Sequence, residues 1–123
     1  MTMLNTFDLF KTDELLAARM VALDRTGKRL SRLIDELNGI NEDLDRLDQI
    51  LFAPGISEDA RQDLLAEIDL AVGAYNHLRE ASSGAYRQLI LQREGCGFRS
   101  HEVLRHAYPI PELHQPLPED FLG

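Results

Sequence analysis

Apolar residues recur along the first half of the chain at alternating steps of three and four residues. The pattern has no interruption between residues 30 and 51, where the aliphatic positions are Leu30, Leu33, Leu37, Ile40, Leu44, Leu47 and Leu51. This spacing places one apolar stripe along one side of an α-helix. Thr12 is a suitable N-cap because Asp13 and Glu14 follow it in the first turn. No proline interrupts the stretch that follows, so we predict a helix over residues 12–53.

A second stripe follows a short break in the pattern. Its positions are Leu64, Ile68, Ala71, Tyr75, Leu78, Ser82, Ala85 and Leu89. Pro54 and Gly55 end the first helix, and Ser57 is the expected N-cap of the second. The second stripe stops at the glycines of residues 95–97, which predicts a helix over residues 57–94. Two long helices of similar length with a short connection favour an antiparallel hairpin.

The two ends of the chain differ from the hairpin in composition. We interpret residues 1–11 as an N-terminal arm. In residues 95–123, Ser100 is the expected cap of a short helix that ends near His106. Prolines at 109, 111, 116 and 118 then predict an extended tail. The predicted fold class is therefore all-α.

The apolar stripes are wider than the seam between two helices. A hairpin cannot enclose such stripes by itself, and wide stripes are typical of bundles. The residues that we expect in the helix-packing and dimer seam are Leu30, Leu33, Ile34, Leu37, Ile40, Leu44, Leu47, Leu51, Leu65, Ile68, Val72 and Ile90. A second copy or a different protein would supply the missing faces, and we favour a homodimer that forms a four-helix bundle, since two-fold homodimers are the commonest oligomers. The alternative is a monomer whose C-terminal segment covers the exposed strip.

The arm and the tail contain apolar residues that suit docking to a partner. The partner-binding candidates are Phe7, Phe10, Tyr108, Ile110, Leu113, Leu117 and Phe121. An apolar arm suits a groove, and a proline-rich tail loses little entropy on binding. The alternative is that these residues close the strip of their own hairpin.

Charge is distributed unevenly along the chain. The net charge is −8, and residues 35–69 alone carry −9 because they contain eleven acids and two bases. In a hairpin these residues meet at the closed end, where the acidic tip contains Asp43, Asp45, Asp48 and Asp59. This charge argues against direct nucleic-acid binding, which needs a basic patch. A basic protein partner, nucleic-acid mimicry and a merely solvated surface remain as interpretations.

One level halfway along the hairpin carries small residues. Gly27 and Ser82 lie at equal distances from the turn, and Ser83 and Gly84 follow. Glycine in a helix interior costs about 1 kcal/mol relative to alanine, so its presence at this level calls for an explanation. The backbones of the two helices approach closely here, both helices bend here, or the small residues are placed by chance on exposed faces.

Metal and catalytic chemistry find little support. Cys96, His101, His106 and His114 are spaced C-x4-H-x4-H-x7-H, which does not match the paired short spacings of zinc sites. The chain contains no nucleophile elbow, P-loop or dinucleotide fingerprint. We therefore expect no cofactor, no metal and no enzymatic activity, and the role of Cys96 stays open.

The remaining features concern location and function class. No apolar run approaches the roughly 20 residues that span a bilayer, the N-terminus lacks the pattern of a secretory signal, and one cysteine allows no internal disulfide. We expect a cytoplasmic protein that does not contact membranes. Its predicted function is a non-enzymatic protein-interaction module that sequesters, chaperones or inhibits a protein partner. The alternatives are a structural subunit of a larger assembly and an acidic mimic of nucleic acid.

Overall fold

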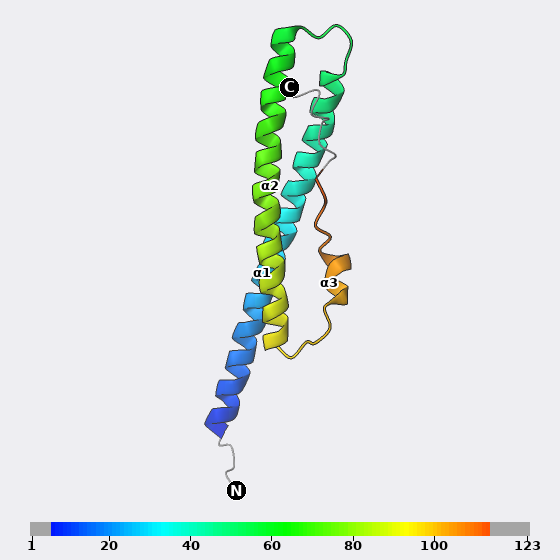
Figure 1. The fold of residues 1–123 in the computed structure, drawn as a ribbon. Coiled ribbons are helices and arrows are strands. Elements are labelled where there is room, and N and C mark those ends of the chain that lie inside the picture. Colours follow the sequence, from blue (N-terminus) through cyan, green and yellow to red (C-terminus); the bar gives the residue numbers. More distant parts are fainter. Residues whose placement is uncertain (1–5, 114–123) are drawn as a thin grey trace. The chain divides into compact units, whose positions relative to one another are not determined.

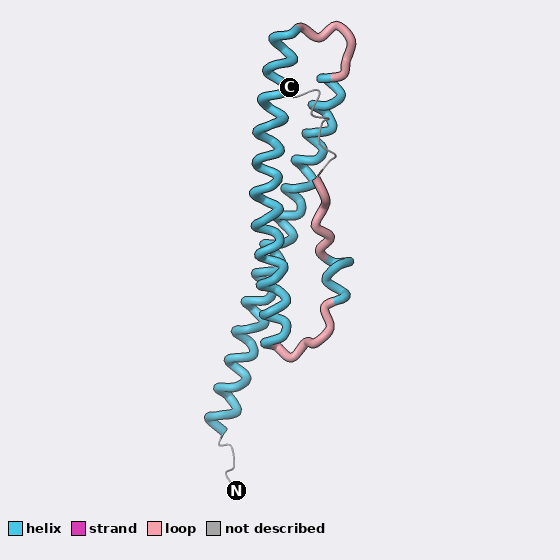
Figure 2. Tube along the Cα trace, viewed as in Figure 1, coloured by secondary structure: helices cyan, strands magenta, loops and turns pink. Residues whose placement is uncertain are grey.

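The computed structural model describes the backbone of residues 6–113 and the side chains of residues 13–113. These residues form three helices, α1 (Thr6–Leu51), α2 (Glu58–Gly95) and α3 (Glu102–Ala107), and no strand (Figure 1). A turn over residues 52–57 joins the two long helices, and a loop of the same length, residues 96–101, precedes α3 (Figure 2). The prediction of an all-α fold with two long helices, a turn and a short third helix is confirmed.

The turn between α1 and α2 has the chemistry that its sequence predicts. Gly55 adopts a positive φ of 83°, which a residue with a side chain rarely adopts. Ser57 is the N-cap of α2, because its Oγ accepts a hydrogen bond from the Ala60 backbone N–H at 3.2 Å. Glu58 and Asp59 lie in the first turn of α2, where carboxylates complement the helix dipole.

The C-terminus of α2 is closed by a Schellman motif. The Phe98 N–H donates to the Arg93 carbonyl and the Gly97 N–H donates to the Glu94 carbonyl, both at 3.0 Å. Gly97 has a φ of 94°, so glycine is needed at this position. The predicted stop at residues 95–97 is therefore confirmed, with Gly97 as the residue that makes the turn.

Two predicted helix starts were wrong. α1 begins at Thr6 instead of Thr12, because residues 6–11 contain neither glycine nor proline and the hydrogen-bond ladder continues through them. Most of the predicted arm is therefore helical. The N-cap of α3 is His101, without a side-chain cap, instead of Ser100. The Ser100 carbonyl instead accepts a hydrogen bond from Arg93 Nη2 at 3.0 Å, which places Ser100 in the preceding loop.

Backbone contacts divide the chain into two compact units. The described part of the first, which we call the terminal unit, comprises residues 6–31 and 84–109. The described part of the second, which we call the tip unit, comprises residues 32–83 and 110–113. The sequence predicted one hairpin over residues 12–94, whereas both long helices contribute to both units.

The buried residues of the terminal unit come from all three helices. They are Thr26, Gly27, Leu30, Ala85, Leu89 and Leu104. The Thr26 hydroxyl donates to the Ala22 carbonyl at 3.1 Å, so this buried polar group is satisfied within its own helix. Gly27 is buried beneath Tyr108, whose hydroxyl would lie 2.6 Å from a Cβ atom at this position. A close approach at Gly27 is thus present, and the approaching group is a tyrosine side chain.

The tip unit has a core that the C-terminal segment helps to cover. Leu44, Leu51 and Ile68 are its central buried cluster. The partly buried residues around this cluster are Ile40, Leu47, Leu64, Leu65, Ala71, Val72 and Leu113. Farther along α2, Ser82 is completely buried, and its hydroxyl donates to the Leu78 carbonyl at 2.8 Å. In the tip unit, the apolar stripe of α1 and that of α2 are therefore buried or half-buried.

Candidate functional site

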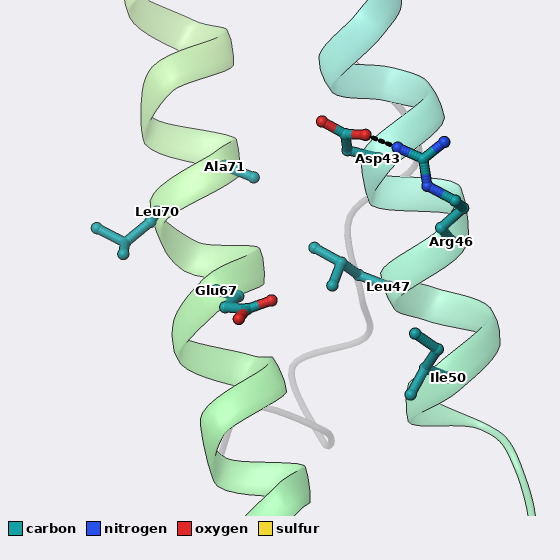
Figure 3. A pocket seen from close by; sticks show the side chains of 7 residues that line it. All are labelled: Asp43, Arg46, Leu47, Ile50, Glu67, Leu70 and Ala71. Carbon is teal, nitrogen blue, oxygen red and sulfur yellow. Dashed lines mark hydrogen bonds and ion pairs between the residues drawn. The ribbon is translucent and has the colours of Figure 1, made fainter.

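An open groove of about 400 Å³ lies between α1 and α2 in the tip unit. Its lining residues are Asp43, Arg46, Leu47 and Ile50 of α1 and Glu67, Leu70 and Ala71 of α2 (Figure 3). The α1 positions repeat at steps of three and four, and so do the α2 positions, so each helix contributes one continuous side of the groove.

The groove has an apolar floor and two exposed apolar rim residues, Ile50 on α1 and Leu70 on α2. The Leu70 side chain points away from α1, toward the outer side of α2 (Figure 3). Leu47 and Ala71 point toward each other across the groove and also pack against the core of the tip unit (Figure 3). Ile50 on one rim is 51% exposed, and Leu70 on the other is 75% exposed. Because Leu70 follows the buried Ile68 by two residues, about 200° around the helix, it cannot face the same core. Both rim side chains are therefore available to another molecule.

The polar residues of the groove are mainly acidic. Arg46 and Asp43, three residues apart on α1, form an ion pair, which satisfies the one base that lines the groove (Figure 3). Glu67 faces the groove from α2. Asp63 is an exposed residue one turn before Glu67, on the same side of the helix. An apolar floor with carboxylates beside it thus faces the solvent.

The predicted acidic-tip residues lie at different places in the tip unit. Asp43 lines the groove, whereas Asp59 occupies the exposed first turn of α2. Asp45 is exposed and Asp48 is half-buried, and both belong to α1. Of these four acids, only Asp43 is a groove-lining residue.

The twelve predicted seam residues are buried or half-buried within the single chain. Leu30, Ile34, Leu37, Leu44, Leu51 and Ile68 are buried, and Leu33, Ile40, Leu47, Leu65, Val72 and Ile90 are half-buried. None of these twelve is exposed. The exposed large apolar residues are instead Leu15, Leu16, Met20, Val21, Ile50, Phe52, Leu70, Leu91, Phe98 and Val103. None of these ten is among the twelve predicted seam residues, although Leu16 and Met20 lie on the stripe of α1 and Ile50 lies beside it. The signal that could have found Leu70 and Leu91 is their position two residues after a buried one.

The described tail residues belong to the two units, with Tyr108 in the terminal unit and residues 110–113 in the tip unit. Tyr75 is completely buried, and its hydroxyl donates to the Pro111 carbonyl at 2.6 Å. Asn41 Nδ2 donates to the Glu112 carbonyl at 3.2 Å. Of the partner-binding candidates, Tyr108, Ile110 and Leu113 are half-buried, while Leu117, Phe121 and the side chains of Phe7 and Phe10 lie outside the described residues. Residues 110–113 therefore pack on their own hairpin, as the alternative interpretation expects.

Arg93 contacts several residues of the loop that follows α2, which contains Cys96. Arg93 Nε donates to His101 Nδ1 at 3.3 Å, and its guanidinium carbon lies 4.7 Å from the centre of the Phe98 ring. His101 Nε2 lies 3.3 Å from Glu94 Oε1. Cys96 is a half-buried free thiol, His106 is exposed, and His114 is outside the described residues. Within the described part of the chain, no group of three or more His, Cys, Asp or Glu residues is arranged to hold a metal ion.

Comparisons with protein-family models, with curated proteins and with solved structures found no match. None of the helices in the described part of the chain combines the length and the apolar character that crossing a membrane requires.

Proposed function

We propose that this protein is a small, non-enzymatic interaction module that sequesters, chaperones or inhibits a protein partner. The observation that carries the proposal is the groove of the tip unit, in which apolar floor residues lie between two exposed apolar rims, Ile50 and Leu70. Apolar surface that is open to solvent and bordered by charged residues is typical of protein interaction sites. A cytoplasmic location fits a chain with a single cysteine.

The groove suits a protein better than a small molecule. Small-molecule sites enclose most of their ligand in a concave cavity. This groove is open along its length and lies between two parallel rows of side chains, so it would cover only one face of a ligand. One face of a helix or strand is what such a surface contacts.

The proposal also includes a homodimer, which the terminal unit supports. Arg19 Nη1 donates to the carbonyl of Gly95, the last residue of α2, at 3.1 Å. α1 continues for 13 residues before Arg19, or about 20 Å. Leu16 and Met20 continue the stripe of the buried Leu30 toward this end, yet both are more than 40% exposed. An apolar helix end with these exposed side chains is a suitable contact for a second copy.

Charges on this helix end favour an antiparallel arrangement of two copies. Asp13 and Glu14 precede the apolar residues, and Arg19 lies among them. Two such ends packed antiparallel would bring the acids of one copy toward the arginine of the other. In this arrangement the α2 helix of each copy would flank the paired α1 ends, and the predicted four-helix bundle would need a longer overlap that brings both α2 helices to the same level.

Affinity capture from a lysate of the native source tests the interaction function. The full-length chain is the bait, mass spectrometry identifies bound proteins, and light scattering measures the mass of the purified complex. We expect one protein bound at fixed stoichiometry. Recovery of the chain alone, as a higher oligomer of defined mass, would contradict the proposal and support a structural subunit instead.

A further inference from the structure

We propose that the groove of the tip unit binds one amphipathic helix of the partner, with an apolar stripe flanked by lysine and arginine residues. This inference rests on the proposed interaction function and specifies the docking surface and the chemistry of the ligand. Three features of the groove carry it, namely the shape of its lining, the position of its exposed apolar residues and its charge.

The lining of the groove matches the face of a helix. Along α1, Asp43, Leu47 and Ile50 are spaced by four and three residues. The two sides form a trough over the contact between α1 and α2, with Leu47 and Ala71 as the floor (Figure 3). A third helix laid in such a trough contacts it through residues at positions i, i+3, i+4 and i+7. Ile50 would then contact the docked helix from the α1 side, and Leu70, whose side chain points away from α1, would lie at the outer edge of the contact (Figure 3).

The charge of the groove selects a basic ligand. Glu67 lines the groove, Asp63 lies one turn away on the same side, and Arg46 is already paired with Asp43. Residues 35–69 carry −9 in total, so the potential around the groove is negative. Lysine and arginine residues beside the apolar stripe of a ligand would find the carboxylates of Glu67 and Asp63 along α2.

The same charge disfavours two copies that meet groove to groove. A two-fold contact places the same surface of both subunits together, so the acids of one groove would face those of the other. Nucleic acid is disfavoured for the same reason, because its phosphates are negative. A basic helix of a different protein satisfies both the apolar and the charged parts of the groove.

A labelled peptide tests the inference directly. The probe is a helix-forming peptide of about 18 residues, or five turns, with leucines at i, i+3, i+4 and i+7 spacing and lysines at the remaining positions. Fluorescence anisotropy measures its binding to the full-length chain. In the groove variant, Ile50→Gln and Leu70→Gln together remove both rims. The control variant, Leu91→Gln with Val103→Gln, replaces two residues that are 67% and 57% exposed in the terminal unit.

We expect the groove variant to bind the peptide at least roughly tenfold more weakly than the natural chain, since a buried leucine contributes about 1.5–3 kcal/mol. The control variant should bind as the natural chain does. Circular dichroism verifies that all chains are equally helical. Equal affinity of the natural chain and the groove variant would overturn the inference.

A second arm tests the charge. Replacing every lysine of the peptide with glutamate should abolish binding, and Glu67→Gln should weaken binding of the lysine peptide by up to about fivefold at low salt. Glu102→Gln, an exposed acid of α3, is the matched control and should have no effect. Binding of the glutamate peptide as tight as that of the lysine peptide would overturn the inference.

Capture experiments separate this inference from the proposed function. If the natural chain retains a partner and the groove variant loses it, both stand. If the groove variant retains the partner equally well, the docking surface is wrong while the interaction function stands. If the natural chain captures nothing, the function and the inference that rests on it fail together. A groove variant that turns a dimer into a monomer would identify a second copy as the ligand and overturn the inference.

Discussion

Gly27 shows how one residue without a side chain can fix the position of a distant one. It is buried in α1, where the hydroxyl of Tyr108 occupies the space next to its backbone. A Cβ atom at Gly27 would lie 2.6 Å from that hydroxyl and 3.5 Å from the ring carbon that bears it. The first distance is too short for two unbonded atoms, whereas the second is an ordinary contact. The conflict therefore arises from one oxygen atom.

This geometry predicts an unusual response to alanine. Gly73→Ala, in α2 with open space around it, should raise the free energy of unfolding by about 0.5–1 kcal/mol because alanine favours helices. Gly27→Ala should raise the free energy of unfolding by less than this amount, or lower it. In a Tyr108→Phe background, without the hydroxyl, the gain at Gly27 should approach that at Gly73. Urea unfolding of these five chains measures each difference, and equal gains at both glycines in the natural background would contradict the contact between Tyr108 and Gly27.

At the scale of an element, the segment after α3 is held by polar contacts from the long helices of the tip unit. Tyr75 and Asn41 donate hydrogen bonds to two successive backbone carbonyls, those of Pro111 and Glu112. Leu113 then packs against the buried cluster of Leu44, Leu51 and Ile68. The Tyr75 side chain is completely buried, so water cannot replace this hydrogen bond. The Tyr75 hydroxyl and the Pro111 carbonyl therefore satisfy each other.

Tyr75→Phe should therefore lower the free energy of unfolding by about 0.5–1.5 kcal/mol. It should also loosen the segment, so that the methyl resonances of Leu113 move toward their random-coil positions in NMR spectra. Tyr86→Phe, which changes a half-buried tyrosine of the same helix, is the control and should leave Leu113 in place. An unchanged Leu113 spectrum in Tyr75→Phe would show that the hydrogen bond does not hold the segment.

The elements differ in how far the sequence predicts them. The ends of α2 follow from local chemistry, because Ser57 and Gly97 act on neighbouring backbone groups. The contacts of Tyr108 with Gly27 and of Tyr75 with Pro111 join residues 81 and 36 positions apart, and no local pattern encodes them. The stripe positions from Leu30 to Leu51 and from Leu64 to Leu89 are buried or half-buried, whereas Leu16 and Met20, earlier on the first stripe, are exposed. The groove depends on residues beside the stripe, such as Leu70, and is therefore visible only once both helices are packed.

At the scale of the whole molecule, the two units expose different chemistry. The tip unit contains most of the acids and the groove. The terminal unit exposes apolar residues near the start of α1, among them Leu16 and Val21, together with arginines such as Arg19 and Arg25. If the terminal unit forms the dimer and the tip unit binds the partner, the two functions are separable by substitution. This separation is what a dimeric binding module requires, because each copy then keeps its own groove.

Leu16→Glu tests that separation. Two copies that pack through the start of α1 would bury this carboxylate in an apolar contact, which costs several kcal/mol when the charge is unpaired. Light scattering should show the natural chain at twice 13.9 kDa and Leu16→Glu at 13.9 kDa at the same concentration. The groove variant with Ile50→Gln and Leu70→Gln, which changes only the tip unit, should stay dimeric. Leu16→Glu should in turn still bind the lysine peptide, because the groove lies wholly within one chain. A natural chain that is monomeric at every measured concentration, or a Leu16→Glu chain that remains dimeric, would remove the start of α1 as the contact between copies.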